Sequence, residues 1–332
     1  MMKEKGQAAK PVVAVDIGGT KIMTAIFASD GKIMAKDVRP TLGVEGVNRV
    51  IERISSAIEG LLSDNNVKTS QTGAICIACA GGIDTGRGVV VTPSPHLPDW
   101  VEIPLADTIK KKLGISTYLI NDASAAALGE HRYGAGRGVK NLVLLTLGTG
   151  IGGGIIADGK LYLGAVGGAG EIGHMTIDVN GPRCGCGNIG CLEILASGTA
   201  IAKNTVERIK RGEKSSLADM AGGDLNNITT EAIGQAARNG DKLAREVIGR
   251  AAYYLGIGMV NVVNIFNPEM VIIGGGMAEL GEMIIGPGRK MVAERAFSIS
   301  ARAVRIVTAQ LGNEAGIYGA AAFALDSARR TG

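Results

Sequence analysis

Three of the five cysteines in this 332-residue chain lie close together, and a histidine precedes them. The stretch reads "HMTIDVNGPRCGCGNIGC", and its candidate metal ligands are His174, Cys184, Cys186 and Cys191. Three sulfurs and one imidazole nitrogen complete a tetrahedral zinc shell and leave no position for water, so the set predicts structural rather than catalytic zinc. The alternative is a group of buried thiols without metal, although the stretch is too rich in glycine for an apolar core.

Glycine-rich turns form a second group of candidate residues. "IGGTK" follows the apolar run "VVAVD", and "GTGIGGG" follows the similar run "NLVLLTL". Glycines let backbone N–H groups approach a phosphate without a Cβ in the way, while Thr20 and Thr149 add hydroxyl donors and Lys21 adds a positive charge. Asp16, at the end of its strand, is a candidate Mg²⁺ ligand, either directly or through water.

Neither turn is a standard nucleotide motif. A Walker A loop needs Gly-x-x-x-x-Gly-Lys-Ser/Thr at a helix start, and "GTGIGG", which has dinucleotide spacing, is followed by a strand pattern. A third turn, "VIIGGGMAELGE", follows a strand and opens a helix, which a simple connection would also do. The candidate nucleotide-binding residues are Asp16, Gly18, Gly19, Thr20, Lys21, Gly148, Thr149, Gly150, Gly274, Gly275 and Gly276.

Short apolar strands alternate with helices along the chain, which is the α/β pattern. Apolar runs predict strands at 12–16 and 73–78, and helical spacing predicts helices at 45–62 and 105–113. A further strand, "STYLI", ends at Asn121 and runs into an alanine-rich helix. These elements must position the candidate residues, which lie at or just after strand ends.

The chain contains an approximate internal repeat. "GTKIMTAIFASDGKIM" and "GTGIGGGIIADGKLYL" align with one deletion, which matches Gly-Thr with Gly-Thr and Asp-Gly-Lys with Asp-Gly-Lys. Reuse of favoured turn residues is the alternative explanation, because Asp-Gly occurs in many hairpins. Two matched turns at a matched interval favour two related halves, each of which begins with a strand, a glycine turn and a strand.

Composition narrows the classes of function. The net charge of +4 is spread along the chain, which gives no basic patch for nucleic acid, and no apolar run approaches the roughly 18 residues of a membrane span. The N-terminus lacks the apolar core of a signal peptide, so we expect a cytoplasmic protein with neither a nucleic-acid nor a membrane partner. An odd number of cysteines argues against a disulfide framework, and the length allows two lobes.

Six motifs have the order and approximate spacing found in the ROK family of repressors and sugar kinases: "DIGGTK", "INDASAAALGE", "LGTGIGGG", "GAGEIGHM", "CGCGNIGCLE" and "VIIGGGM". The chain resembles this family from about Val12 to Leu325, and it looks most like the bacterial glucokinases. The resemblance implies an α/β, two-lobed, hexokinase- and actin-like ATPase fold (ribonuclease H-like) with a cleft between the lobes. It implies ATP-dependent phosphorylation of a hexose at its 6-hydroxyl, with glucose favoured, and the cofactors ATP, Mg²⁺ and structural Zn²⁺.

The resemblance also assigns roles to single residues. It implies that Asp122 is the catalytic base, whereas its position at a helix start also suits an N-cap. His174 would bind zinc through one ring nitrogen and a sugar hydroxyl through the other. The implied sugar-binding residues are Gly81, Asn121, Asp122, Glu171, His174 and Glu193. Two residues depart from the family pattern, because Ala80 replaces a proline and His96 replaces an asparagine.

We expect a smaller N-terminal lobe at 1–121, a larger lobe with the zinc loop at 122–310, and a C-terminal helix at 311–332 that returns to the first lobe. A homodimer or homotetramer is expected from the family. Alternatives are a kinase for fructose, mannose or N-acetylmannosamine and a sugar-sensing regulator, although about ten residues before the first strand are too few for a helix-turn-helix. A filament-forming actin-like protein would not need the zinc and sugar motifs.

Overall fold

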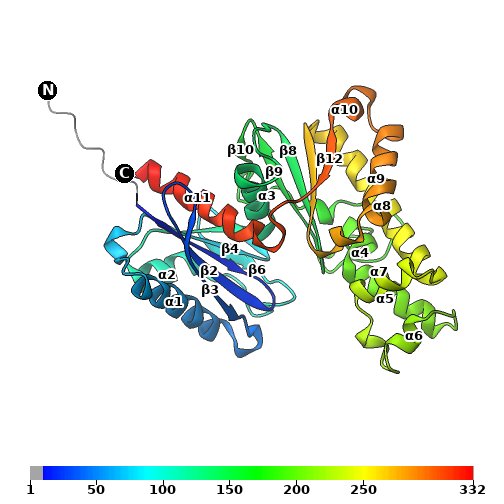
Figure 1. Cartoon of the computed structure of the whole chain (residues 1–332), viewed down its shortest axis with the longest axis horizontal. Coiled ribbons are helices and arrows are strands. Elements are labelled where there is room, and N and C mark those ends of the chain that lie inside the picture. Colours follow the sequence, from blue (N-terminus) through cyan, green and yellow to red (C-terminus); the bar gives the residue numbers. More distant parts are fainter. Residues whose placement is uncertain (1–9, 332) are drawn as a thin grey trace. The chain divides into compact units, whose positions relative to one another are not determined.

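The computed structural model describes residues 10–331, which divide into two compact units (Figure 1). Unit 1 contains the residues up to Arg137, Leu161–Ala169 and the residues from Asn313 on. Unit 2 contains Gly138–Lys160 and Gly170–Gly312. Each unit is built on a five-stranded sheet with helices packed against it, so the α/β class predicted from the alternating pattern is confirmed.

Unit 1 has the strand order β3-β2-β1-β4-β7. β1 pairs antiparallel with β2 and parallel with β4, and β4 pairs parallel with β7. Both faces of β1 are buried, because Val13 and Val15 pack with α1 and α2 while Val12 packs with α3 and α11. The elements are β1 (Val12–Ile17), β2 (Lys21–Phe27), β3 (Ile33–Pro40), η1 (Gly43–Glu45), α1 (Val47–Asp64), η2 (Thr69–Gln71), β4 (Ile75–Cys79), β5 (Gly82–Asp84), β6 (Val89–Thr92), α2 (Leu105–Leu113), β7 (Thr117–Asn121), α3 (Asp122–Tyr133) and α11 (Ala315–Thr331).

Unit 2 repeats this strand order as β10-β9-β8-β11-β12, again with an antiparallel hairpin followed by parallel strands. The predicted repeat of strand, glycine turn and strand is therefore confirmed. Its core centres on α8, whose Leu255, Met259 and Val263 are buried. The elements are β8 (Leu142–Leu147), β9 (Ile151–Ala157), β10 (Lys160–Leu161), η3 (Ile172–His174), α4 (Leu192–Ala196), α5 (Gly198–Lys210), α6 (Leu217–Met220), η4 (Leu225–Asn227), α7 (Thr230–Arg238), α8 (Lys242–Phe266), β11 (Met270–Gly274), η5 (Gly276–Leu280), α9 (Glu282–Arg295), α10 (Ser298–Ala303) and β12 (Arg305–Thr308). The short η6 (Gly312–Glu314) spans the boundary where the chain returns to unit 1.

The unit boundary differs from the one expected at residue 121. Helix α3 belongs to unit 1 because it packs closely on α11, which lies beside the strands of that unit in Figure 1. The two helices approach through glycines, since a Cβ on Gly319 would lie 1.7 Å from the carbonyl oxygen of Ala125. The two units contain similar numbers of residues, so neither is clearly the smaller. Within residues 10–331, none of the helices combines the length and the apolar character that crossing a membrane requires.

Candidate active site and metal centre

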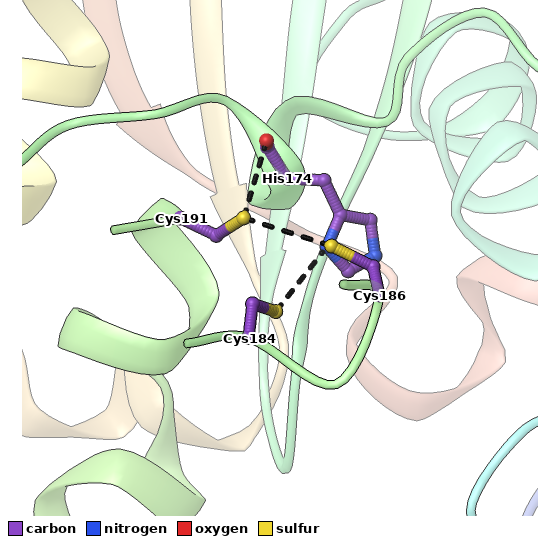
Figure 2. Close-up of side chains that lie close together, drawn as sticks. All are labelled: His174, Cys184, Cys186 and Cys191. Atoms are coloured by element: carbon purple, nitrogen blue, oxygen red, sulfur yellow. Dashed lines mark hydrogen bonds between the residues drawn. The ribbon is translucent and has the colours of Figure 1, made fainter. Parts of the chain in front are cut away.

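The four predicted metal ligands come together in unit 2 (Figure 2). The Sγ atoms of Cys186 and Cys191 are 3.7 Å apart, and the Sγ of Cys184 is 3.8 Å from Nδ1 of His174. All four ligand atoms lie within 4.8 Å of one another. A tetrahedral ion with Zn–S bonds of about 2.3 Å separates its sulfurs by about 3.8 Å, so this donor set fits zinc.

The loop that carries these ligands is held by backbone hydrogen bonds and by glycines. The N–H of Cys184 donates to the carbonyl of Asn188 (2.8 Å), and Thr176 forms a β-bridge with Cys191. Gly190 has φ +63°, and a Cβ there would lie 1.6 Å from the carbonyl oxygen of Asp178. Only glycine fits at this position, which explains part of the glycine content that argued against an apolar core.

The protonation of the thiols also suits a metal centre. Burial and the neighbouring thiols raise the pKa of Cys191 to about 12, while the N–H of Asn188 lowers the pKa of Cys186. Crowded thiolates repel one another unless a cation lies between them, and a bound metal deprotonates its thiol ligands outright. The three sulfurs therefore need a positive ion to become ligands together.

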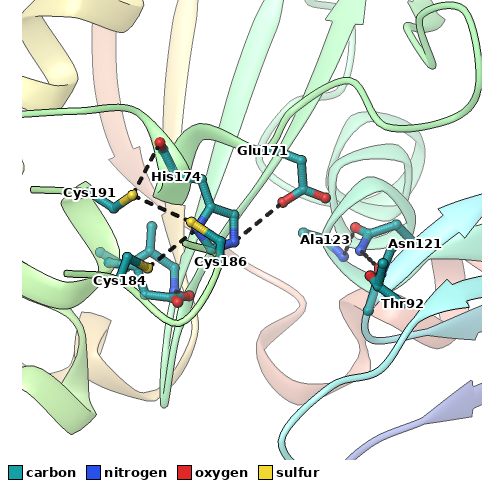
Figure 3. Close-up of polar contacts among 12 residues, drawn as sticks. Thr92, Asn121, Ala123, Glu171, His174, Cys184, Cys186 and Cys191 are labelled. Carbon is teal, nitrogen blue, oxygen red and sulfur yellow. Dashed lines mark hydrogen bonds and ion pairs between the residues drawn. The ribbon is translucent and has the colours of Figure 1, made fainter. Parts of the chain in front are cut away.

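The second ring nitrogen of His174 faces away from the sulfurs. Its Nε2 lies 3.9 Å from Oε2 of Glu171, as Figure 3 shows. With Nδ1 bound to a metal, Nε2 would carry the proton and could donate to a carboxylate or a hydroxyl. The side chain of Glu171 is about half exposed, so this pair is open to a ligand.

Glu193 connects the metal loop to the glycine turn of unit 2. It follows Cys191 by two residues, and its Oε2 accepts a hydrogen bond from the N–H of Ile151 (2.9 Å). A Cβ on Gly150 would lie 2.4 Å from the same oxygen. The glycine turn at 274–276 packs against the end of β8, just before the glycine turn of unit 2. A Cβ on Gly275, which has φ +81°, would lie 2.3 Å from the carbonyl oxygen of Leu147.

In unit 1, the strand ends bring the other candidates together. Asn121 is the N-cap of α3, and its Oδ1 accepts from the N–H groups of Ala123 (2.9 Å) and Ser124 (3.1 Å). Its Nδ2 donates to the carbonyl of Gly81 (3.3 Å), which has φ +108°. The capping role that the sequence left open for Asp122 is thus filled by Asn121, and Figure 3 shows this cap.

Two carboxyl groups, those of Asp16 and Asp122, lie half-buried and close enough to interact at this edge of the sheet. Burial raises the pKa of Asp16 to about 7, helped by the charge of Asp122 and opposed by Lys21. Burial also raises the pKa of Asp122, whereas the hydrogen bond that its Oδ1 accepts from Ala123 lowers it. Like charges held together in a poorly solvated site are typical of a position that binds a cation or transfers a proton.

Both glycine hairpins present unused hydrogen-bond donors. Within residues 10–331, the backbone N–H groups of Gly19, Thr20, Thr149 and Gly150 donate no hydrogen bond. The first turn is closed instead by the N–H of Gly18, which donates to the carbonyl of Lys21 (2.9 Å). Free N–H groups in a turn form the kind of concave surface that binds phosphate oxygens.

Sequence reasoning missed one residue that supports the first hairpin. The hydroxyl of Thr41 donates to the carbonyl of Gly18 (2.7 Å), and its N–H donates to the carbonyl of Thr20 (2.9 Å). Thr41 is fully buried, but a single threonine after a strand carries no recognisable signal. The two cysteines outside the metal loop, Cys76 and Cys79, are buried core residues of β4.

Two α/β units of the same strand order, each with a phosphate-type glycine hairpin, define a protein of the hexokinase- and actin-like ATPase fold class. The ROK family matches residues 12–327, and the chain belongs to this family, as its motifs predicted.

Individual proteins of known name or structure also place the chain in the ROK family. The chain is 39% identical to a glucokinase of Thermotoga maritima, over 93% of this chain and 96% of that protein. A ROK family glucokinase from Streptomyces griseus, solved in complex with glucose and AMPPNP, is 34% identical with a TM-score of 0.80, over 96% of this chain and 99% of that one. A ROK family transcriptional regulator, a homolog of the E. coli MLC protein, is 29% identical with a TM-score of 0.84, over 96% of this chain and 79% of that one.

Proposed function

We propose that this protein phosphorylates a hexose at its 6-hydroxyl with ATP, and that glucose is the preferred substrate. The observation that carries the proposal is the similarity, over 96% of the chain, to a ROK family glucokinase that binds glucose and AMPPNP. The geometry of each unit supports it, because free N–H groups for phosphate lie on both hairpins and carboxylates lie at the strand ends. The expected cytoplasmic location and homodimer or homotetramer remain predictions.

Asp122 is proposed to act as the general base. Its carboxylate takes the proton of the 6-hydroxyl as that oxygen forms a bond to the γ-phosphorus, and the bond from this phosphorus to the leaving oxygen of ADP breaks. Burial raises the pKa of Asp122 and makes the carboxylate a better proton acceptor, while the hydrogen bond from the N–H of Ala123 lowers this pKa. The hairpin N–H groups and Lys21 bind the phosphates.

The sugar is proposed to bind through the remaining polar groups of the predicted set. Carboxylates, an amide and an imidazole can orient several hydroxyls at once and discriminate between epimers. His174 would donate through Nε2, with Nδ1 held by zinc, so the metal would position a sugar ligand without taking part in catalysis. The residues are Gly81, Asn121, Glu171, His174 and Glu193.

The proposal is tested by ADP release from Mg·ATP with a panel of hexoses and amino sugars. We expect sugar-dependent turnover, with glucose giving the highest kcat/KM. A higher kcat/KM with fructose, mannose or N-acetylmannosamine would make that sugar the preferred substrate and would leave the kinase function unchanged. A sugar-sensing regulator is the second candidate, favoured by the TM-score of 0.84 to a ROK family transcriptional regulator. Sugar binding without ADP release would support it.

Asp16 is proposed to bind Mg²⁺, which neutralises phosphate charge when it is bound. A pKa of about 7 means that Asp16 is mostly protonated at pH 6 and mostly ionised at pH 8. Because cation binding requires the carboxylate, the apparent Mg²⁺ affinity should rise roughly tenfold between these pH values. The measurement is the Mg²⁺ dependence of ADP release at both pH values in native protein and in Asp16→Asn. Equal Mg²⁺ affinity of the native protein at pH 6 and pH 8 would contradict the assignment.

A further inference from the structure

His96, which replaces a family asparagine, lies directly on the glycine hairpin of unit 1. A Cβ on Gly19 would lie 2.5 Å from Cγ, 2.6 Å from Cδ2 and 2.9 Å from Nδ1 of the His96 imidazole. The ring thus rests against the backbone of the turn. His96 is exposed, so its other edge is accessible to a ligand.

The loop around His96 is fixed by the core rather than by the imidazole itself. Ser94 and Leu97 form a β-bridge, and Leu97 and Trp100 are each only 1% exposed. The carbonyl oxygen of His96 lies against Gly43, where a Cβ would be 2.3 Å away. Substitution of the exposed ring should therefore leave the path of the loop intact.

The same loop also contacts the segment proposed to bind sugar. The N–H of Gly82 donates to Oγ1 of Thr92 (3.0 Å), and a Cβ on Gly81 would lie 2.5 Å from the carbonyl oxygen of Thr92. Thr92 is thus beside Gly81, whereas His96 is beside Gly19. The loop therefore runs from beside Gly81, which is proposed to bind sugar, to beside Gly19, which is proposed to bind phosphate. The imidazole of His96 lies beside Gly19.

The charges near the Gly19 turn favour a further hydrogen-bond donor to phosphate. Asp16 and Asp122 are acidic, and Lys21 is the cationic side chain of the turn, while a nucleotide brings several negative charges. The free N–H groups of Gly19 and Thr20 supply two donors next to the ring. We propose that His96 is a further nucleotide-binding residue, whose ring N–H donates to phosphate oxygens of ATP held at Gly19 and Thr20. This inference rests on the proposed kinase function.

The kinetic test compares native protein with His96→Ala and His96→Asn. Loss of a hydrogen bond to a charged group should raise KM for Mg·ATP roughly tenfold in His96→Ala and leave KM for glucose within about twofold. Asp99→Ala is the matched control, because Asp99 is an exposed residue of the same loop, and its KM values should equal those of the native protein. A raised KM for glucose or a changed ranking of sugar epimers, with KM for ATP unaltered, would overturn the proposal, as would no change at all.

A binding titration separates a phosphate contact from a structural role. Calorimetry with adenosine, ADP and AMPPNP should show no loss of adenosine affinity in His96→Ala and a growing loss as phosphates are added. An equal loss for all three ligands would indicate a structural role and overturn the proposal. If the native protein shows no turnover with any sugar, the kinase function fails, and the AMPPNP titration still decides whether His96 binds phosphate.

Discussion

Asp122→Asn should lower kcat by about 10²- to 10⁴-fold, the usual contribution of a general base. The amide cannot take the proton of the 6-hydroxyl, but it is nearly the same size and its oxygen can still accept the N–H of Ala123. Asn121 remains as the N-cap of α3, so the helix start should be preserved. KM for Mg·ATP and KM for glucose should change much less than kcat, because the lost interaction acts in the transition state.

The measurement is steady-state ADP release with saturating glucose and Mg·ATP, together with the melting temperature of each variant. Asp107→Asn is the matched control, because Asp107 is an exposed carboxylate in the first turn of α2 in the same unit. Its kcat should equal that of the native protein. An Asp122→Asn protein with native kcat would show that another group removes the proton.

Cys184→Ser should abolish zinc binding and weaken glucose binding by about 10- to 100-fold, the usual effect of losing a group that orients a ligand-binding side chain. The Sγ of Cys184 lies 3.8 Å from Nδ1 of His174, so loss of this sulfur should remove the ion that would hold the imidazole. The loop has few apolar residues of its own, and metal binding supplies much of the free energy that folds such a segment. We therefore also expect a lower melting temperature.

Zinc content is measured by atomic absorption, and glucose affinity by calorimetry in native protein, Cys184→Ser and chelator-treated native protein. Cys76→Ala is the control, because it removes a buried thiol of β4 that lies outside the cluster in unit 2. It should keep its zinc and its glucose affinity, with only a modest loss of stability from the small cavity. Zinc-free native protein that binds glucose normally would contradict the link between the metal and the sugar.

Much of the site was predictable because its residues are close together in sequence. His174, Cys184, Cys186 and Cys191 fall in one glycine-rich loop, and the structure brings their ligand atoms together. The two glycine hairpins were visible as turns after apolar strands, and their free N–H groups suit the predicted phosphate role. In these cases the residue types and short spacings contain most of the information, since local backbone geometry decides the outcome.

Contacts between residues distant in sequence could not be read in this way. Glu193 binds the N–H of Ile151, 42 positions earlier, and Asn121 binds the carbonyl of Gly81, 40 positions earlier. The placement of His96 on Gly19 likewise depends on how a loop packs against a hairpin from another part of the chain. No periodic pattern indicates such pairs.

The amino-acid sequence by itself determined the family, the α/β class, the repeated strand–turn–strand start of each half and the donor set of the candidate metal centre. Only the tertiary structure decided that α3 packs with α11 in unit 1, that Asn121 rather than Asp122 caps α3, and which partners Glu193 and His96 contact. The physical reason is that strands, turns and metal loops follow from neighbouring residues, whereas helix packing and strand-end contacts depend on close steric fit between segments that are far apart in the chain.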